Sequence, residues 1–553
     1  MTSRKALIAV VSAAVVFGIV VIPVWADSVT TSVTVGNSAP SFTAGPAESP
    51  ASDGTTPTNV GSDVTFTATG TDSNNEDYYL AICKTNSVTP VNGGAPTCGG
   101  GSWCISTATT SASQASCAYT ALQGDAESND WYAFVCDGNS SAADCSSSSQ
   151  GTGGSGSPFK VNHPPVFNSY SNDTPKNPGQ DITWSTDAST LDNDTDTASD
   201  TVKLVVCKTA GVSGGDCDGG ASDRWCQSSL VASDPSCAYS IPTPTADGAV
   251  SAYVYLFDSH NLGATTNQGS SSDYTVNNVA PVVSAVTLNG GSAITLTEGT
   301  TTNVVIGATV TDNNACNDGL SVETSLYRSG VGYGTCDTNP EDDDNNCYAV
   351  ISCSVVGAGN TCTGATDASA DYTCTVAVQY FADPTDASTV YPTENWLATV
   401  KATDDNAATD NAEVAAGVEM NSLVGYSVTS SIAYGSLGVG QSNDPLDKIT
   451  TVTATGNVGL DQEVSGTNMT SGPNNILVGY QHYALAGSTA YASGTSLTGT
   501  PTEIELNCQK TTSTGAPATA NTWWGLSVPV GTIAGSYSGT NTLVAVKGEI
   551  VNW

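Results

Sequence analysis

An internal repeat marked by cysteines restricts the fold of this chain more than any other feature. The stretch "ICKT" at 82–85 returns as "VCKT" at 206–209, and aligning the two places "SWCIST" on "RWCQSS" and "WYAFVCD" on "AYVYLFD". Residues 37–161 and 162–277 are therefore two copies of one module. A third start, "NNVAPVV" at 277–283, opens a diverged third copy.

Short apolar alternations indicate that these modules are built from strands. "DVTFTATG" at 63–70 and "VVIGATVT" at 304–311 lie between turn clusters of Gly, Asn and Asp. A period of two between such turns is typical of half-buried strands. No apolar pattern of helical period is sustained after residue 26, so we expect an all-β chain.

Comparing the two copies narrows the disulfide pairing. Cys136 aligns with Phe257 and Cys145 has no counterpart, so this pair is lost together and is predicted to bond to itself. Four cysteines remain shared, and they allow three connectivities. Pairing of neighbours is favoured because each bond closes a short loop in both copies, with Cys83–Cys104 as the rival. The shared positions are Cys83, Cys98, Cys104 and Cys117 in the first copy and Cys207, Cys217, Cys226 and Cys237 in the second.

The cysteine counts also indicate the compartment. The third copy holds six cysteines, again an even number, and no CxxC pair of the kind that binds zinc occurs in the chain. Even counts predict structural disulfides formed in an oxidising environment. Cys508 stands alone in the last part of the chain. It is either a free buried thiol, which we favour, or an intermolecular link.

Charge excludes one class of partner. The chain has 13 Lys and Arg against 52 Asp and Glu, a net charge of −39. Binding to nucleic acid or to anionic lipid requires clustered basic residues, so nucleic acid is excluded as a partner. The charge attracts divalent cations, but a merely soluble or salt-adapted surface has the same composition.

The first 26 residues have the pattern of an export segment. Arg4 and Lys5 precede an apolar run from Ala6 to Val24, and "VWA" before Asp27 supplies the small residues of a cleavage site. The run approaches the length that spans a bilayer, so an uncleaved anchor is the alternative. Membrane attachment is expected only through this segment, and the protein is expected outside the cell or on its surface.

The module pattern resembles a known group of proteins. Modules that open with "NSAP" or "NHPP", carry an acidic turn after an early strand and end in "FKV" or "YTV" resemble the tandem immunoglobulin-like and cadherin-like modules of prokaryotic secreted surface proteins. The resemblance covers residues 37 to 420 and implies β-sandwiches in a row. Residues 528–545, "VPVGTIAGSYSGTNTLVA", resemble the closing strands of C-terminal β-sandwich domains on bacterial and archaeal surface proteins.

These observations give a predicted division of the chain. It comprises a signal peptide or signal anchor at 1–26, a disulfide-braced β-sandwich at 27–161, a homologous one at 162–277, a diverged one at 278–424 and a C-terminal one at 425–553. We call these the first to fourth modules.

Acidic turns recur at one position of the module frame and are candidate calcium sites. They lie between the strand that begins each module and the next, and they place alternating Asp and Asn on a tight turn, where several oxygens can converge on a hard cation. The alternative is that Asp and Asn are ordinary solvated turn residues. The candidate ligands are Asp72, Asn74, Glu76 and Asp77 in the first module, Asp192, Asp194 and Asp196 in the second, and Asp312, Asn314 and Asp318 in the third.

Two further observations bear on cation binding. Cadherin-like modules bind calcium near their junctions, so the resemblance implies that Asn37, Asn162 and Asn278 contribute ligands. The densest acidic run, "DTNPEDDDNNC" at 337–347, is pinned between two cysteines. For that run we favour an exposed, disulfide-bounded loop over a metal site.

Enzyme signatures are missing. The three histidines, His163, His260 and His482, are too few and too scattered for a Ser-His-Asp or His-metal site. A GxSxG match at 211–215 has no helix after it to form a nucleophile elbow. We therefore expect no catalytic activity. The adjacent Trp523 and Trp524 should point to opposite faces of a strand, where the outward ring either stacks on a sugar or, as we favour, packs under a loop.

The predicted function is that of a secreted, modular, structural or adhesive protein of the cell surface: a stalk, a surface-layer component or a filament subunit. Its expected partners are other surface proteins, copies of itself, or glycans. The alternative is an extracellular carbohydrate-binding or carbohydrate-processing protein. That alternative requires a concave site lined by Trp or Tyr with two convergent carboxylates.

Overall fold

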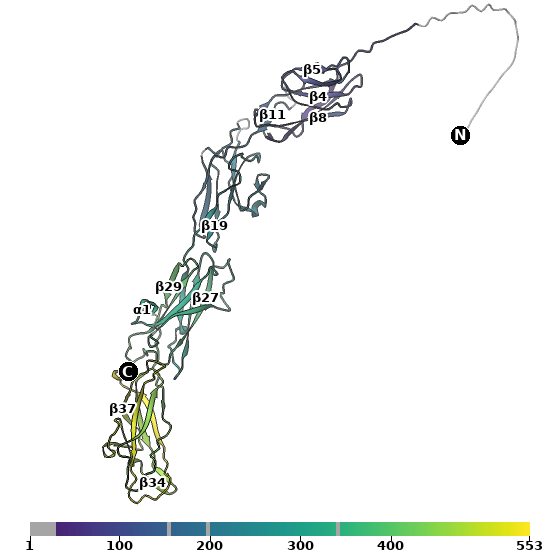
Figure 1. Ribbon diagram of the computed structural model, residues 1–553. Helices are drawn as coiled ribbons and strands as arrows, with labels where there is room; N and C mark the ends of the chain where they lie inside the picture. Colours follow the sequence, from purple (N-terminus) through teal and green to yellow (C-terminus); the bar gives the residue numbers. More distant parts are fainter. Residues whose placement is uncertain (1–28, 152–155, 188, 195–199, 339–342) are drawn as a thin grey trace, which may run out of the picture. The chain divides into compact units, whose positions relative to one another are not determined.

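The protein is all-β, with β-sandwich modules in tandem. The computed structural model describes residues 29–151, 156–187, 189–194, 200–338 and 343–553, and its regular secondary structure consists almost wholly of strands joined by loops (Figure 1). The predicted export segment lies outside the described residues. Of the described residues, 29–163 and Asp194 form one compact unit and the others form a second.

The first module packs two three-stranded antiparallel sheets face to face. Strand β3 alternates buried and half-buried positions, so Val64, Phe66 and Ala68 point into the core. The Phe66 ring lies edge-on to Trp131 at 5.2 Å between centroids. Burial of each such aromatic ring stabilises the fold by about 1.5 to 3 kcal/mol. The sheets are β1 (Ser41–Glu48), β3 (Asp63–Thr71) and β8 (Gln114–Thr120), and β10 (Tyr132–Asp137), β4 (Tyr78–Cys83) and β7 (Ser102–Ile105).

Short strands close the first module. The parallel pairing of β2 with β11 and the antiparallel pairing of β11 with β9 bring the end of the module back onto its core, where Phe159 is fully buried. These elements are β2 (Thr58–Asn59), β9 (Ser128–Asn129) and β11 (Phe159–Asn162), with a hairpin of β5 (Val88–Val91) and β6 (Gly94–Cys98).

The second module repeats this arrangement, as its sequence predicts. One sheet has the order β12-β13-β18 and the other β17-β14-β20-β21, which are the counterparts of β1-β3-β8 and β7-β4-β10. Trp184 on β13 occupies the position that Phe66 has on β3, and it is fully buried. The strands are β12 (Tyr170–Asn172), β13 (Asp181–Thr186), β14 (Val202–Cys207), β15 (Val212–Ser213), β16 (Asp216–Cys217), β17 (Arg224–Gln227), β18 (Ser236–Ser240), β19 (Gly248–Val250), β20 (Tyr253–Asp258), β21 (Ser270–Ser271) and β22 (Tyr274–Val276).

The third module joins its layers through one strand. Strand β26 pairs with β25 along its first part and with β27 from Cys353 onward, so the ladder runs without a break in the order β23-β24-β27-β26-β25-β28-β29. Val350, in the middle of β26, has a positive φ of 55°, which bends the strand where it passes between its partners. The strands are β23 (Val282–Leu288), β24 (Thr302–Thr311), β25 (Ser321–Arg328), β26 (Cys347–Val355), β27 (Ser369–Val378), β28 (Trp396–Thr403) and β29 (Thr409–Glu413).

The fourth module has a five-stranded and a three-stranded sheet. Trp524 is fully buried between them and donates its indole N–H to Thr450 Oγ1 at 2.9 Å. The sheets are β30 (Tyr426–Val428), β31 (Lys448–Ala454), β38 (Thr519–Leu526), β35 (Gln481–Ala484) and β36 (Thr495–Ser496), and β37 (Thr502–Cys508), β32 (Leu460–Gly466) and β39 (Asn541–Lys547). A hairpin of β33 (Met469–Ser471) and β34 (Asn474–Ile476) completes the module.

Helical structure is confined to short turns in the described part of the chain. The α-helix α1 spans Tyr333–Thr338, and the 3₁₀ turns span Gly220–Ser222, Asn289–Gly291, Val478–Tyr480, Tyr491–Ser493 and Ile550–Asn552. None of the helices among the described residues has the length and apolar character needed to cross a membrane.

Eight disulfide bonds brace the first three modules. The shared cysteines are bonded as neighbours, Cys83 to Cys98 and Cys104 to Cys117, rather than Cys83 to Cys104, and Cys136 is bonded to Cys145. The second module contains the equivalent bonds Cys207–Cys217 and Cys226–Cys237. The third contains Cys316–Cys362, Cys336–Cys347 and Cys353–Cys374. A set of this size is typical of chains that fold in an oxidising, extracytoplasmic compartment.

Candidate metal centres

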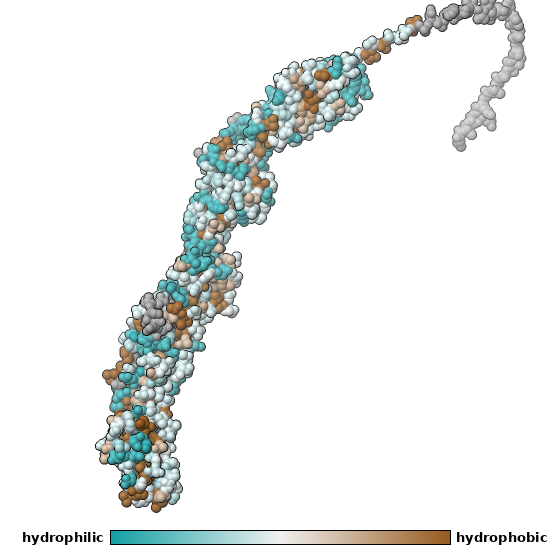
Figure 2. Space-filling model, in the orientation of Figure 1, coloured by the Kyte–Doolittle hydropathy of each residue, from teal (hydrophilic) through white to brown (hydrophobic). Residues whose placement is uncertain are grey.

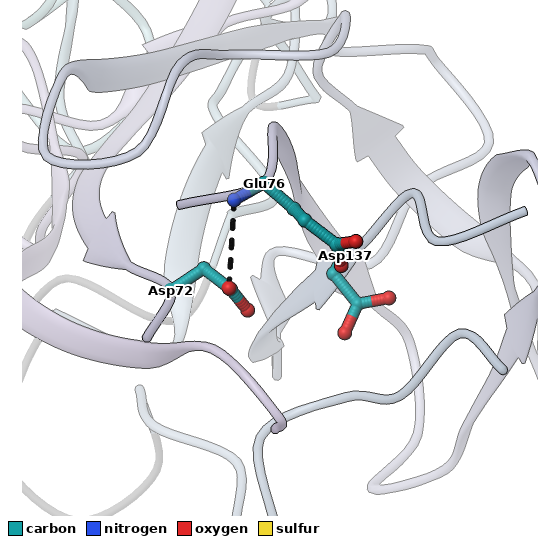
Figure 3. A group of neighbouring side chains, drawn as sticks. All are labelled: Asp72, Glu76 and Asp137. Atoms are coloured by element: carbon teal, nitrogen blue, oxygen red, sulfur yellow. Dashed lines mark hydrogen bonds between the residues drawn. The ribbon is translucent and has the colours of Figure 1, made fainter. Parts of the chain in front are cut away.

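In the first module, three carboxylates meet at one end of the sandwich. Asp72 follows β3, Glu76 lies just before β4, and Asp137 ends β10. Because β10 pairs with β4 so that Asp137 lies opposite Tyr78, the end of β10 is held beside the acidic turn. One oxygen of each carboxylate lies within 4.8 Å of the other two (Figure 3). The acidic turn of the first module lies between β3 and β4. From the sequence we expected it between the first strand of the module and the next strand, so that expectation was wrong.

Backbone and amide donors orient these carboxylates and use only part of their oxygens. Asp72 Oδ1 accepts a hydrogen bond from the Asn74 backbone N–H at 2.6 Å, and Asp137 Oδ1 accepts from the Asn139 N–H at 3.1 Å. Asn37, at the start of the module, donates its amide to Asp137 Oδ2 at 2.7 Å. The module start is thereby tied to the end of β10, and the carbonyl oxygen of the Asn37 amide remains for another partner.

Three buried oxygens at this place accept no hydrogen bond from any described residue. They are Asn37 Oδ1, Asp72 Oδ2 and Glu76 Oε2. Leaving a buried acceptor without a donor costs about 1 to 3 kcal/mol, and more when the acceptor is charged. Since all three atoms are acceptors, they cannot satisfy one another. A hard cation coordinated by carboxylate and amide oxygens satisfies such a set, and calcium takes 6 to 8 oxygens in irregular geometry.

The third module has the same arrangement with different residues. Asn278 donates its amide to Asp404 Oδ2 at 2.9 Å, as Asn37 does to Asp137. Asp312 Oδ1 accepts from the Asn314 N–H at 2.8 Å, as Asp72 does from Asn74. The oxygens that accept no hydrogen bond from a described residue are again three, and at equivalent places: Asn278 Oδ1, Asp312 Oδ2 and Asp318 Oδ2.

The third module gathers more negative charge than the first. Asp318 lies with Asp405, and with Asp247 from the loop before β19, so that one oxygen of each is within 4.8 Å of the others. Burial, followed by the charges of Asp405 and Asp247, raises the pKa of Asp318 to about 6. Burial is also the main cause that raises the pKa of Asp312. Carboxylates packed in this way without a counter-charge destabilise one another, and a bound divalent cation reverses that effect.

In the second module, Asp192 and Asp200 bring carboxylate oxygens within 4.8 Å of each other. Asp194 Oδ2 accepts the backbone N–H of His163 at 2.6 Å, as Asn74 Oδ1 accepts that of Ser38 at 2.9 Å in the first module. Asp194 Oδ1 lies 3.2 Å from Nδ1 of the His163 ring. Burial raises the pKa of the Asp194 carboxyl. The predicted ligand Asp196 lies outside the described residues.

The start of the fourth module has the same hydrogen bond between an asparagine side chain and the backbone as the third module, but it lacks the acidic residues. Asn457 accepts the Leu423 N–H at 2.6 Å, as Asn314 accepts that of Val279 at 2.7 Å. Thr455 then stands where the third module has Asp312. The Lys547 ammonium donates to Ser422 Oγ at 3.1 Å, so a lysine cation lies where the other modules gather carboxylates.

Several of the predicted turn residues fall in these carboxylate groups. Asp77 is exposed and lies outside the groups found among the described residues, so its role as a ligand stays a prediction. Sequence reasoning missed Asp137 and Asp404, which come from strands distant in sequence. Part of the signal lay in the repeat itself, because "WYAFVCD" and "AYVYLFD" align their final aspartates, Asp137 and Asp258.

Other candidate residues have ordinary structural surroundings. The acidic run at 337–347 is bounded by the Cys336–Cys347 disulfide, and residues 339–342 within it lie outside the described residues. His482 stacks on Tyr491 at 4.1 Å between ring centroids. Trp524 points inward, whereas Trp523 is half-buried and packs close to Gly487.

Comparison with known proteins gives weak likenesses in structure. No family model matches the chain, and no curated protein matches it. Among solved structures it is similar to a marsupial T cell receptor (TM-score 0.26, 11% identity, 65% of this chain and 97% of that one) and to the D1–D4 ectodomain fragment of ICAM-5 (0.25, 8%, 89% and 96%). A third is dimeric latent PorU from Porphyromonas gingivalis (0.16, 12%, 74% and 36%). At these TM-scores the likenesses carry no functional argument.

Proposed function

We propose that this is a structural or adhesive protein of the cell surface whose β-sandwich modules are stabilised by divalent cations, with calcium as the best fit. The observation that supports this proposal is the recurrence of three buried oxygens without hydrogen-bond donors at equivalent places in the first and third modules. A surface that is merely acidic exposes its carboxylates to water. Here the turn, the module start and a distant strand place them together below the surface.

The position of the groups indicates what a cation does. In the first module the residues that would hold it are Asn37, Asp72, Glu76 and Asp137. They come from the segment that enters the module, the β3–β4 turn and the end of β10. In the third module Asp247 adds a carboxylate from the second module. A cation there joins segments that otherwise repel one another, so it stiffens the start of the first and third modules and makes them more resistant to proteolysis and unfolding.

The proposal is tested by calcium titration of the full chain. Calcium is expected to bind with at least two equivalents and to raise the thermal midpoint, and EDTA should reverse the change. Free calcium at a hundredfold excess over the dissociation constant adds about 2.7 kcal/mol to the free energy of unfolding. Magnesium at the same concentration should give a smaller shift, because it requires near-ideal octahedral geometry.

A matched pair of variants assigns the effect to the site. Asp72→Asn removes a buried ligand and should cost one calcium equivalent, whereas Asp77→Asn removes an exposed carboxylate five residues away and should cost none. In EDTA the Asp72→Asn variant should melt no lower than wild type, because the buried carboxylate is itself destabilising without a cation. Equal midpoints with calcium and with EDTA in the wild-type chain would refute the proposal.

Two surface features support a role in assembly with other copies. Residues 29–35, "VTTSVTV", lie outside any strand, and they expose Val29, Val33 and Val35 by 84%, 87% and 77%. With Thr31 these side chains form one face of a strand-like alternation. Residues 29–35 thus have the sequence pattern of a strand but pair with no sheet among the described residues.

The second feature is a groove of about 700 Å³ in the fourth module, where apolar side chains lie among polar atoms. It is lined by residues 432–439 and 532–537 among others, and residues 431–438 belong to no strand. Val530 and Ile533 beside it are 89% and 60% exposed, and Figure 2 shows hydrophobic residues on the surface of this module. Its lining contains Tyr434 and Tyr537 but no carboxylate, so it offers no pair of acids for glycoside hydrolysis. An exposed strand-like segment and an open groove without carboxylates favour the filament or surface-layer role over the carbohydrate-processing alternative.

A further inference from the structure

A separate group of acids lies on the three-stranded sheet of the fourth module, away from the acidic turns. Asp461 is on the central strand β32, Glu505 on its neighbour β37, and Glu549 just after the other neighbour β39. One carboxylate oxygen of each lies within 4.8 Å of the other two. The strands β37 and β32 and the segment after β39 thus each contribute one carboxylate to the group.

The backbone is shaped to bury Asp461 there. The pairing of β32 with β37 shifts register between Leu460 and Gln462, so Asp461 lies opposite a bulge in β37. From that bulge the Asn507 backbone N–H donates to Asp461 Oδ1 at 2.7 Å. On the other side, a Cβ at Gly548 would lie 2.9 Å from Asp461 Oδ2, so a larger residue at position 548 would displace this oxygen.

Asp461 is 1% exposed, and its Oδ2 accepts no hydrogen bond from any described residue. One oxygen of Asp461 lies close to Glu505 and Glu549, which in their ionised form add acceptors rather than donors. A buried carboxylate oxygen in this position is costly unless a proton or a metal ion lies against it. The buried atom therefore points to a ligand independently of the number of acids around it.

The electrostatics of the group agree with this geometry. Burial is the main cause that raises the pKa of Asp461, and the side-chain hydrogen bond with Glu549, followed by the charges of Glu549 and Glu503, raises it further. The charge of Glu549, followed by that of Asp461, raises the pKa of Glu505. Lys547, at the end of β39, does not neutralise these three carboxylates. Its ammonium group donates to Ser422 and lies 4.9 Å from the centre of the Trp553 ring.

We propose that Asp461, Glu505 and Glu549 form a calcium site on the sheet surface of the fourth module. Three carboxylates at this spacing suit a cation that takes oxygens at about 2.3 to 2.6 Å and completes its shell with water. Asp461 fixes the ion from below, while the exposed Glu505 and Glu549 close over it from the two neighbouring strands. The site is built differently from those at the acidic turns and does not depend on them, since the fourth module has Lys547 and Thr455 at the corresponding place.

The test measures bound calcium per chain by equilibrium dialysis, with calcium as the only added probe. The double variant E505Q/E549Q changes two exposed side chains and should leave the fold intact. It is expected to lose one calcium equivalent relative to wild type. The control variant E503Q removes a nearby exposed carboxylate that lies outside the group, and it should keep the full number.

The competing occupant is a shared proton, and the same experiment distinguishes it. If a proton satisfies Asp461, the double variant binds as much calcium as wild type, and this result overturns the proposal. The outcome is separable from the fate of the acidic turns, because Asp72→Asn reports on those sites alone. An unchanged number in E505Q/E549Q with a reduced number in Asp72→Asn would reject only this fourth-module site.

Discussion

The position of Cys508 in the fold makes its thiol unreactive. It is the one cysteine outside the eight disulfide bonds, it lies on β37, and its side chain is 1% exposed. Burial is the main cause that raises the pKa of its thiol, to about 11 from an ordinary value of 9.0. A thiol that is both protonated and covered is a poor nucleophile and a poor partner for an intermolecular disulfide.

Cys508 should therefore resist thiol reagents in the folded protein. At pH 8 the shift lowers the thiolate fraction from about one in ten to about one in a thousand, since each pKa unit is a factor of ten. Titration with a chromogenic disulfide at pH 8 should release no thiol signal from the native chain and one equivalent per chain in guanidinium chloride. Cys508→Ala should give no signal in either condition. Fast release from the native chain would show that β37 opens or that the thiol is exposed.

At the scale of elements, the disulfides have two different tasks. Cys104 on β7 and Cys117 on β8 belong to different sheets, so their bond joins the two layers of the first module, and Cys226–Cys237 does the same in the second. Cys136–Cys145 closes a short loop next to β10 and has no counterpart in the second module, where Phe257 fills the space. The bond between the sheets is thus common to the first and second modules, whereas the loop bond Cys136–Cys145 occurs in the first module and not in the second.

Removing the two bonds should have unequal effects on the first module. Their loops are of similar length, so loss of either cross-link lowers the free energy of unfolding by about 2 to 3 kcal/mol through the unfolded chain. Replacing Cys104 and Cys117 by Ala also loosens the contact between sheets, whereas replacing Cys136 by Phe and Cys145 by Ala copies the packing of the second module. Thermal melting of the two variants in calcium should show the larger drop for Cys104→Ala/Cys117→Ala. An equal or reversed order would mean that the inter-sheet bond adds no packing.

At the scale of the whole molecule, local features were predictable and distant ones were not. The all-β architecture followed from period-two runs, and the repeat predicted the bond between Cys136 and Cys145 because both cysteines are missing together from the second copy. Asp137 and Asp404 were missed because their closeness to the turns depends on pairing between strands far apart in sequence. Asp461 was missed because nothing in its sequence surroundings marks the bulge that buries it.

We expect the exposed segment at 29–35 to control the association of one chain with another. If this segment adds to the groove of the fourth module in another copy, its Val33 and Val35 side chains become buried. Val33→Asp combined with Val35→Asp would then place two charges against an apolar lining, which is strongly unfavourable. We expect wild-type chains to associate with rising concentration in light scattering, and the double variant to remain monomeric.

Two comparisons make this assignment specific. Thr34→Asp adds a charge to the opposite face of the same segment and should leave association unchanged, because alternate residues of a strand point to opposite sides. Ile533→Asp, beside the groove, should reduce association as the valine changes do, since it alters the other half of the same contact. Electron microscopy of the wild-type and variant chains then shows whether the associated form is a filament or a lattice. Association that survives the valine changes but not Ile533→Asp would mean that the groove receives a different segment.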